Sequence, residues 1–88
     1  MVRQTFVIQN PTGLHLKPAA VLCTEAIRYE SMIKLHCGNV IVNAKSVLNV
    51  LGAGIKCGDE IELSCEGPDE AEALKNLGRL ILDGLENS

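Results

Sequence analysis

The residue best placed for chemistry is His15, which stands where a turn-rich segment, 10–13, gives way to helical periodicity. At a helix start the N–H groups of Leu16 and Lys17 have no intrahelical acceptor, and the helix dipole adds partial positive charge. An anion on His15 would meet those donors and the charge of Lys17. Because the pKa of histidine lies close to neutrality, the ring can act as an unprotonated nucleophile. The spacing alone leaves a second reading open, in which the ring merely caps the helix.

Other patterns argue against metal and hydrolytic chemistry. His36 falls on an expected strand, and no spacing supplies a third ligand beside it, so we expect no metal site. The sequence contains no G-x-S-x-G motif, no P-loop motif and no acidic cluster for magnesium. We therefore expect neither a hydrolase nor a kinase, and no bound cofactor.

The cysteines are expected to be free thiols. There are four of them, at separations of 14, 20 and 8 residues and without a C-x-x-C pair: Cys23, Cys37, Cys57 and Cys65. Zinc sites and redox pairs use shorter spacings. The first residues lack the apolar region of a signal peptide, which predicts a cytoplasmic protein with reduced thiols. All but Cys57 fall on apolar stripes, where cysteine acts as a small hydrophobic residue.

Composition limits the class of protein. The chain has 88 residues, 47% of them hydrophobic and 22% charged, which predicts a single globular domain over residues 1–88. Two side chains are aromatic and the formal net charge is −3, so neither base stacking nor charge supports nucleic-acid binding. No apolar run is long enough to span a membrane. We expect a monomer.

Hydrophobic periodicity predicts the element order β-α-β-β-α-β-α. Strands are expected at 2–8, 32–37, 40–44 and 60–66, and helices at 16–29, at 46–51 and after Asp69. Ser46 is a good N-cap residue for the second helix, and Asp69 with Glu72 predicts a capping box for the third. These patterns predict an α+β fold, an open-faced β-sandwich with a four-stranded antiparallel sheet, three helices on one face and solvent on the other.

Three motifs give the chain a resemblance to a known family. They lie at 11–20, with the string PTGLHLKPAA, at 42–48 and at 67–74. With the length and element order, they resemble the histidine-containing phosphocarrier protein (HPr) of the bacterial phosphoenolpyruvate:sugar phosphotransferase system over essentially the whole chain. Two residues differ from the family's usual active-site string. Leu16 replaces a small residue, and Lys17 replaces an arginine, whose rigid fork suits phosphate.

The resemblance implies a stoichiometric phosphoryl carrier and not an enzyme. His15 would take a phosphoryl group on Nδ1 from enzyme I, which draws it from phosphoenolpyruvate, and pass it to the A domain of a sugar permease. The backbone amides of Leu16 and Lys17 would bind the phosphate, with help from the Lys17 side chain.

The resemblance also implies a docking surface around the histidine. Its residues come from the first and second helices: Ala20, Thr24, Ile27, Val47, Leu48 and Leu51. The apolar side chains of so short a second helix cannot all point inward, so we expect some of them to be exposed to partners.

Ser46 gains a second reading from the resemblance, as the target of an ATP-dependent HPr kinase/phosphorylase. A phosphate there would place about two negative charges on the docking face. The alternative function is therefore an HPr-like regulatory protein, read through phospho-Ser46 by a catabolite-control transcription factor in carbon catabolite repression, with carrier activity weakened by Leu16 and Lys17. The presence of His15 favours the carrier. A third reading, a small interaction or nucleic-acid-binding domain, is disfavoured by charge and aromatic content.

Overall fold

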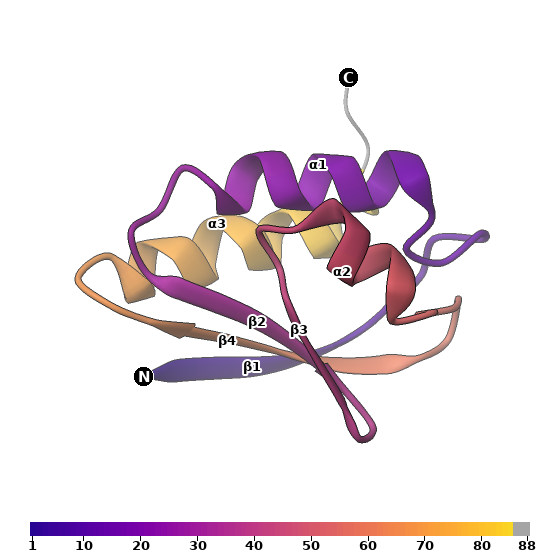
Figure 1. Cartoon of the computed structure of the whole chain (residues 1–88), viewed down its shortest axis with the longest axis horizontal. Coiled ribbons are helices and arrows are strands. Elements are labelled where there is room, and N and C mark those ends of the chain that lie inside the picture. The colour runs from indigo at the N-terminus through magenta and orange to yellow at the C-terminus, as the bar shows by residue number, and fades with distance from the viewer. Residues whose placement is uncertain (86–88) are drawn as a thin grey trace.

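The structure, a computed structural model, describes residues 1–85. Within them, four strands form one antiparallel sheet in the order β1-β4-β2-β3, and three helices cover one of its faces (Figure 1). The strands are β1 (Val2–Val7), β2 (Met32–Cys37), β3 (Val40–Asn43) and β4 (Glu60–Glu66), and the helices are α1 (Leu16–Ala26), α2 (Val47–Gly52) and α3 (Glu70–Leu82). The predicted open-faced β-sandwich and its element order are confirmed.

Alternation along the strands decides which face of the sheet is buried. In β4, the side chains of Ile61, Leu63 and Cys65 are buried against the helices, and those between them point to the open face. Because β4 pairs with both β1 and β2, these three side chains lie at the centre of the core.

The helices complete the other side of the core. α3 packs against β1 and β4, whereas α1 packs against α2 and α3. In α3, a Cβ added to Gly78 would lie 2.9 Å from Cζ of Phe6, so the glycine lets the helix approach β1 closely. None of the helices in the described part of the chain is long and apolar enough to cross a membrane.

Several element ends differ from the predictions. The first helix ends at Ala26 and not at Tyr29, because the Tyr29 N–H donates to Ala26 in a tighter turn and its hydroxyl donates to Glu25 at 2.7 Å. The first strand ends one residue before Ile8, whose N–H donates to Asp59 of the turn before β4. β3 also ends one residue early, and α2 is displaced by one residue.

The predicted capping box at the start of α3 is wrong. Asp69 is the N-cap residue, but its side chain makes no capping hydrogen bond. Its carboxylate instead accepts from the hydroxyl and N–H of Ser31 and from the N–H of Glu30, the last at 2.9 Å. These donors, the Ser31 hydroxyl above all, lower the pKa of Asp69. The carboxylate that reaches back is that of Glu70 and not that of Glu72, and it accepts from the backbone N–H of Gly67 at 3.2 Å.

All four cysteines lie in the described residues and are free thiols, as predicted. Cys23 and Cys65 are buried, Cys37 is half-buried and Cys57 is exposed. Burial raises the pKa of Cys65 to about 11, and it raises the pKa of Cys23 as well. Both therefore remain protonated and act as small hydrophobic side chains.

Candidate functional site

His15 is the N-cap residue of α1, and its ring leaves the helix start open. Its backbone is extended (φ −79°, ψ −173°), and its side chain makes no capping hydrogen bond. Helical bonding begins with the Ala19 N–H, which donates to the His15 carbonyl at 2.9 Å. The N–H groups of Leu16 and Lys17 therefore have no intrahelical acceptor, and Pro18 has no N–H. The reading in which a ring nitrogen of His15 caps the helix is wrong.

A second loop holds the turn that carries His15. The N–H of the buried Leu14 donates to the carbonyl of Ile55 at 3.0 Å. Gly13 has a φ of +69°, and a Cβ at this position would lie 2.3 Å from the Ile55 oxygen, so both conformation and space require glycine. Its N–H donates to Asn10 at 2.9 Å. The turn is thus fixed immediately before the histidine.

Asn10 ties the same turn to the end of α3, because its side-chain amide donates to the carbonyl of Gly84. Sequence reasoning missed both Asn10 and Ile55 as residues that position the site. Neither carries a local signal, since asparagine before proline is an ordinary turn residue and an isolated isoleucine is ordinary core. Their roles depend on contacts between distant segments.

The helix start is positive, and α1 has no acidic residue in its first turn. Glu25 lies about two turns further along, and its carboxylate is bonded to Arg28 at 3.2 Å and to Tyr29. Lys17 is exposed, and the ion pairs found in residues 1–85 do not involve it. A phosphate on His15 would therefore meet two backbone donors, the helix dipole and one unpaired cation.

Ser46 caps α2 as predicted. Its hydroxyl oxygen accepts from the backbone N–H of Asn49 at 3.2 Å and from the Asn49 side-chain amide at 3.1 Å. The Ser46 N–H donates to Asn43 at 3.1 Å, which fixes the turn that leads into the helix.

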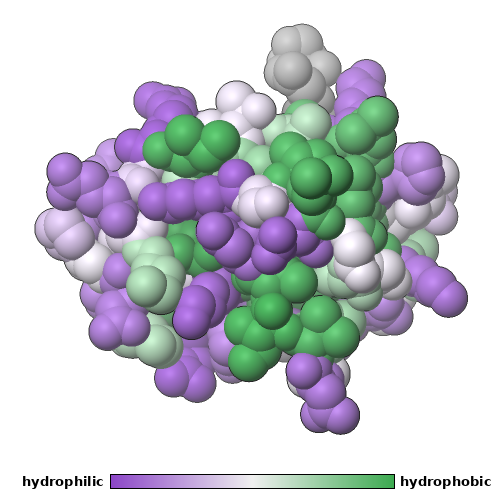
Figure 2. Space-filling model, in the orientation of Figure 1, coloured by the Kyte–Doolittle hydropathy of each residue, from purple (hydrophilic) through white to green (hydrophobic). Residues whose placement is uncertain are grey.

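Apolar side chains are exposed along the face formed by α1 and α2. Figure 2 shows hydrophobic side chains gathered over both helices, which pack against each other. The most exposed are Leu16 (59%), Ile27 (62%) and Leu48 (82%). The remaining expected docking residues are half-buried or exposed: Ala20, Thr24, Val47 and Leu51. The expectation that α2 exposes apolar side chains is confirmed, and Leu16 enlarges this α1–α2 face.

No group of three or more potential metal ligands occurs among residues 1–85. His36 lies in β2, on the open face of the sheet, and its Nε2 is 3.1 Å from the hydroxyl of Ser64. The two histidines therefore occupy different surfaces, and of the two, His15 is the one beside unpaired backbone donors.

Comparison with known proteins assigns the chain to a family. Residues 2–83 match the family PTS-HPr, described as the PTS HPr component phosphorylation site. The phosphocarrier protein HPr of Treponema pallidum is 41% identical over 86 residues, 98% of each chain. The crystal structure of HPr-C-His from Thermoanaerobacter tengcongensis has a TM-score of 0.94 at 39% identity, and covers 100% of this chain and 99% of that one. The HPr-like protein Crh of Bacillus subtilis is 36% identical over 81 residues, 92% of this chain and 95% of Crh.

Fold and family together define the class as a phosphocarrier of the phosphotransferase system, a protein that carries a phosphoryl group. The chain belongs to the HPr family.

Proposed function

We propose that His15 accepts the phosphoryl group that enzyme I draws from phosphoenolpyruvate, and passes it to the A domain of a sugar permease. The observation that carries this proposal is the open start of α1, where an exposed ring without a capping bond stands beside two unpaired N–H groups. Membership of the HPr family supplies the class of reaction.

In the proposed transfer, the lone pair of Nδ1 attacks phosphorus. The N–P bond forms while the bond from phosphorus to the donor group on enzyme I breaks, and the second transfer reverses these roles with the permease domain as acceptor. The N–H groups of Leu16 and Lys17 stabilise charge on the phosphoryl oxygens in both steps. The Lys17 ammonium adds attraction without the fixed geometry of an arginine.

We propose that both partners dock on the α1–α2 face, with apolar contacts to Leu48, Ile27 and Leu16 around the histidine. A small exposed apolar surface suits transient binding, which a carrier needs in order to leave one partner for the next. One transfer uses one such surface, so we propose that the protein acts as a monomer. Its free thiols suit the reducing cytoplasm.

We propose a second role for Ser46, as a site of regulatory phosphorylation by an HPr kinase/phosphorylase. Its position at the start of α2, next to the exposed Leu48, supports this role, since a phosphate there would add charge to the docking face. As a second candidate function we propose a regulator read through phospho-Ser46 by a transcription factor, and the 36% identity to the HPr-like protein Crh is the observation behind it. The presence of His15 supports the carrier function over this alternative.

The test is incubation with phosphoenolpyruvate and a catalytic amount of enzyme I, followed by intact mass spectrometry. We expect the protein to gain one phosphoryl group through an acid-labile, alkali-stable bond, and we expect His15→Ala to gain none. His36→Ala is the matched control, because it removes the other histidine from a different face, and it should be labelled normally. A fully labelled His15→Ala variant would contradict the proposal.

A further inference from the structure

A groove lies between the outer edge of β1 and one face of α3, and we propose that it binds an extended acidic segment of another protein, which adds to the sheet as a fifth strand beside β1. The groove has a volume of about 500 Å³, and its lining comes from β1, α3 and the residue that follows α3. It includes no residue of the α1–α2 face, so the proposal goes beyond the carrier function and is independent of it.

The outer edge of β1 is available for pairing. The Ile8 N–H donates to Asp59 at 2.9 Å, and the Ile8 carbonyl accepts from Gly58 at 2.8 Å, so the backbone groups of Ile8 face the β4 side. Because the direction of these groups alternates along a strand, the backbone N–H and carbonyl groups of Thr5 and Arg3 point away from β4, toward the open edge of the sheet. β1 is an edge strand with a continuous register and no proline, and therefore lacks two common devices that block edge pairing.

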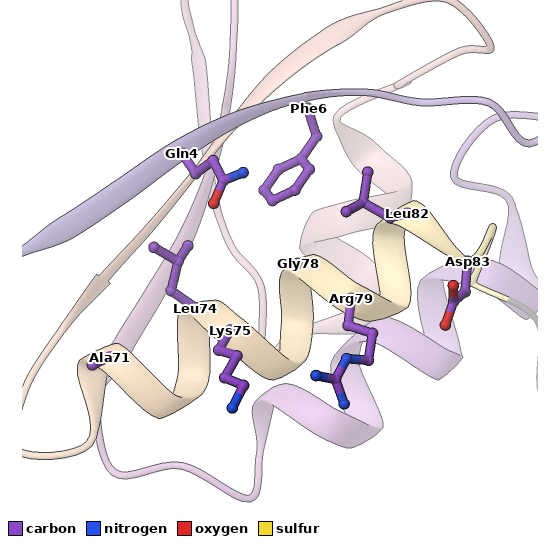
Figure 3. Close-up of a pocket in the computed structure, with 9 residues that line it drawn as sticks. All are labelled: Gln4, Phe6, Ala71, Leu74, Lys75, Gly78, Arg79, Leu82 and Asp83. Carbon is purple, nitrogen blue, oxygen red and sulfur yellow. The ribbon is translucent and has the colours of Figure 1, made fainter.

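The floor of the groove is apolar. Figure 3 shows the Phe6 ring over Gly78, between the side chains of Leu74 and Leu82. Leu82 keeps 68% of its surface exposed, although it is a large hydrophobic residue. A strand added beside β1 lies about 4.8 Å from it and directs every second side chain to one face. Apolar side chains at some of these helix-facing positions would cover this floor, as in other domains that bind peptides by strand addition.

Positive charge on α3 favours an acidic segment. Lys75 and Arg79 line the groove on α3, and neither takes part in the ion pairs of the described chain. Asp83 is the one acidic residue of the lining. Acidic side chains at the other helix-facing positions of the segment would pair with the two cations, whereas basic ones would be repelled. β1 itself contains Arg3 and no acidic residue, so the β1 strand of a second copy would not supply this charge.

The test is an NMR titration of the ¹⁵N-labelled protein with a blocked eight-residue peptide whose helix-facing positions alternate between valine and glutamate and whose other positions are threonine. We expect shifts at Thr5 and Arg3 and along α3 near Lys75, slower exchange of the Thr5 N–H, and no shift at His15. A twin peptide with lysine in place of glutamate should bind about tenfold more weakly. Equal binding of the twins, or shifts confined to the α1–α2 face, would overturn the proposal.

Two variants separate the contribution of the β1 edge to peptide binding from that of the charges on α3. Thr5→Pro removes an outward N–H without removing a bond to β4, and should abolish binding. Arg79→Glu changes one exposed side chain and should weaken binding at least tenfold, whereas Lys34→Glu on the open face of the sheet is the control that should bind normally. Concentration-dependent self-association that Thr5→Pro abolishes would show a second copy as the occupant and contradict the proposal. Phosphorylation of His15 should be the same with and without peptide. A failure of the proposed carrier function would therefore be distinguishable from a failure of the peptide to bind.

Discussion

At the residue scale, the electrostatics of the proposed site involve the Lys17 side chain and the backbone at the start of α1. Lys17 is the one basic residue in the first turn of α1, and the backbone supplies the other attraction through the N–H groups of Leu16 and Lys17. A lysine ammonium is a mobile point charge, while an arginine guanidinium presents a fixed pair of donors. The contribution of Lys17 should therefore come from its charge and depend little on its orientation.

This distinction is tested by two substitutions at one position. Lys17→Arg should transfer phosphate from enzyme I as fast as the parent protein or faster, because it keeps the charge and adds a second donor. Lys17→Glu should slow transfer about tenfold or more, since it opposes both the phosphate and an acidic partner surface. Single-turnover labelling by quench-flow measures both rates. Equal rates for all three proteins would show that Lys17 is only a solvated side chain.

The residues of the site differ in how far the sequence could reveal them. The place of His15, Leu16 and Lys17 at the start of a helix was predictable, because a turn followed by helical periodicity already implies unpaired N–H groups. The roles of Asn10 and Ile55 were not, because each acts through a partner far away in the chain. Local patterns report periodicity and turn chemistry, and contain no information on which distant carbonyl a loop will meet.

At the element scale, the starts of α2 and α3 use their N-cap residues differently. Ser46 bonds to its own helix through Asn49, so its effect is local. Asp69 bonds to the loop between α1 and β2 through Ser31 and Glu30, so it joins two elements. A charge added at Ser46 would therefore act mainly on α2, whereas Asp69 connects α3 to the loop before β2.

Ser46→Asp should keep or raise the melting temperature and slow the transfer of phosphate from enzyme I to His15. Negative charge at a helix N-terminus is favourable by about 0.3–1 kcal/mol. The same charge lies beside Leu48 on the proposed docking face, so partner binding should weaken. Ser46→Ala is the control, because it loses the cap, at a cost of about 0.5–2 kcal/mol, and adds no charge. A Ser46→Asp protein that melts lower and transfers normally would leave Ser46 as a plain cap.

Asp69→Asn should reduce the loss of stability in acid. Hydrogen bonds from the Ser31 hydroxyl and the Glu30 N–H lower the pKa of the folded Asp69 carboxyl below its unfolded value. A lowered folded pKa gives stability that is present above the unfolded pKa, near pH 4, and is lost as pH falls through the folded value. Melting temperatures between about pH 2 and 6 should therefore fall less steeply for the variant.

Glu70 also contributes to the loss of stability in acid, because the Gly67 N–H and the N-terminal ammonium lower its pKa. The melting temperature of the Asp69→Asn protein should therefore still fall with decreasing pH, although less steeply than that of the parent protein. Glu72→Gln, which changes an exposed side chain, should melt like the parent protein across the range. An Asp69→Asn profile parallel to that of the parent would show that the ionisation of Asp69 is not linked to folding.

Element types and order followed from the sequence, because each periodic segment has a single consistent face, as in β4. The ends and caps were less predictable. The end of α1 depends on the buried Tyr29 and its bonds to Glu25 and Asn76. The capping box failed because Ser31 offers Asp69 two donors across the fold, and tertiary hydrogen bonds outweighed the local motif.

At the scale of the whole molecule, the three helices leave two surfaces with different characters. The α1–α2 face contains His15 and the exposed Leu48, whereas the edge of β1 and α3 form a separate groove with Lys75 and Arg79. The core, centred on β4, lies between them and needs no rearrangement for either surface to bind. We therefore expect the groove and the phosphorylation site to operate independently.

The most direct test of the central proposal locates the phosphate on the ring. The protein is labelled with ¹⁵N in its histidines, phosphorylated by enzyme I and phosphoenolpyruvate, and measured by ¹⁵N and ³¹P NMR at alkaline pH, where the bond is stable. We predict coupling between ³¹P and Nδ1 of His15, with the signals of His36 unchanged. Phosphate on His36, on Nε2 of His15 or on a serine, or the absence of any phosphorylation, would contradict the account.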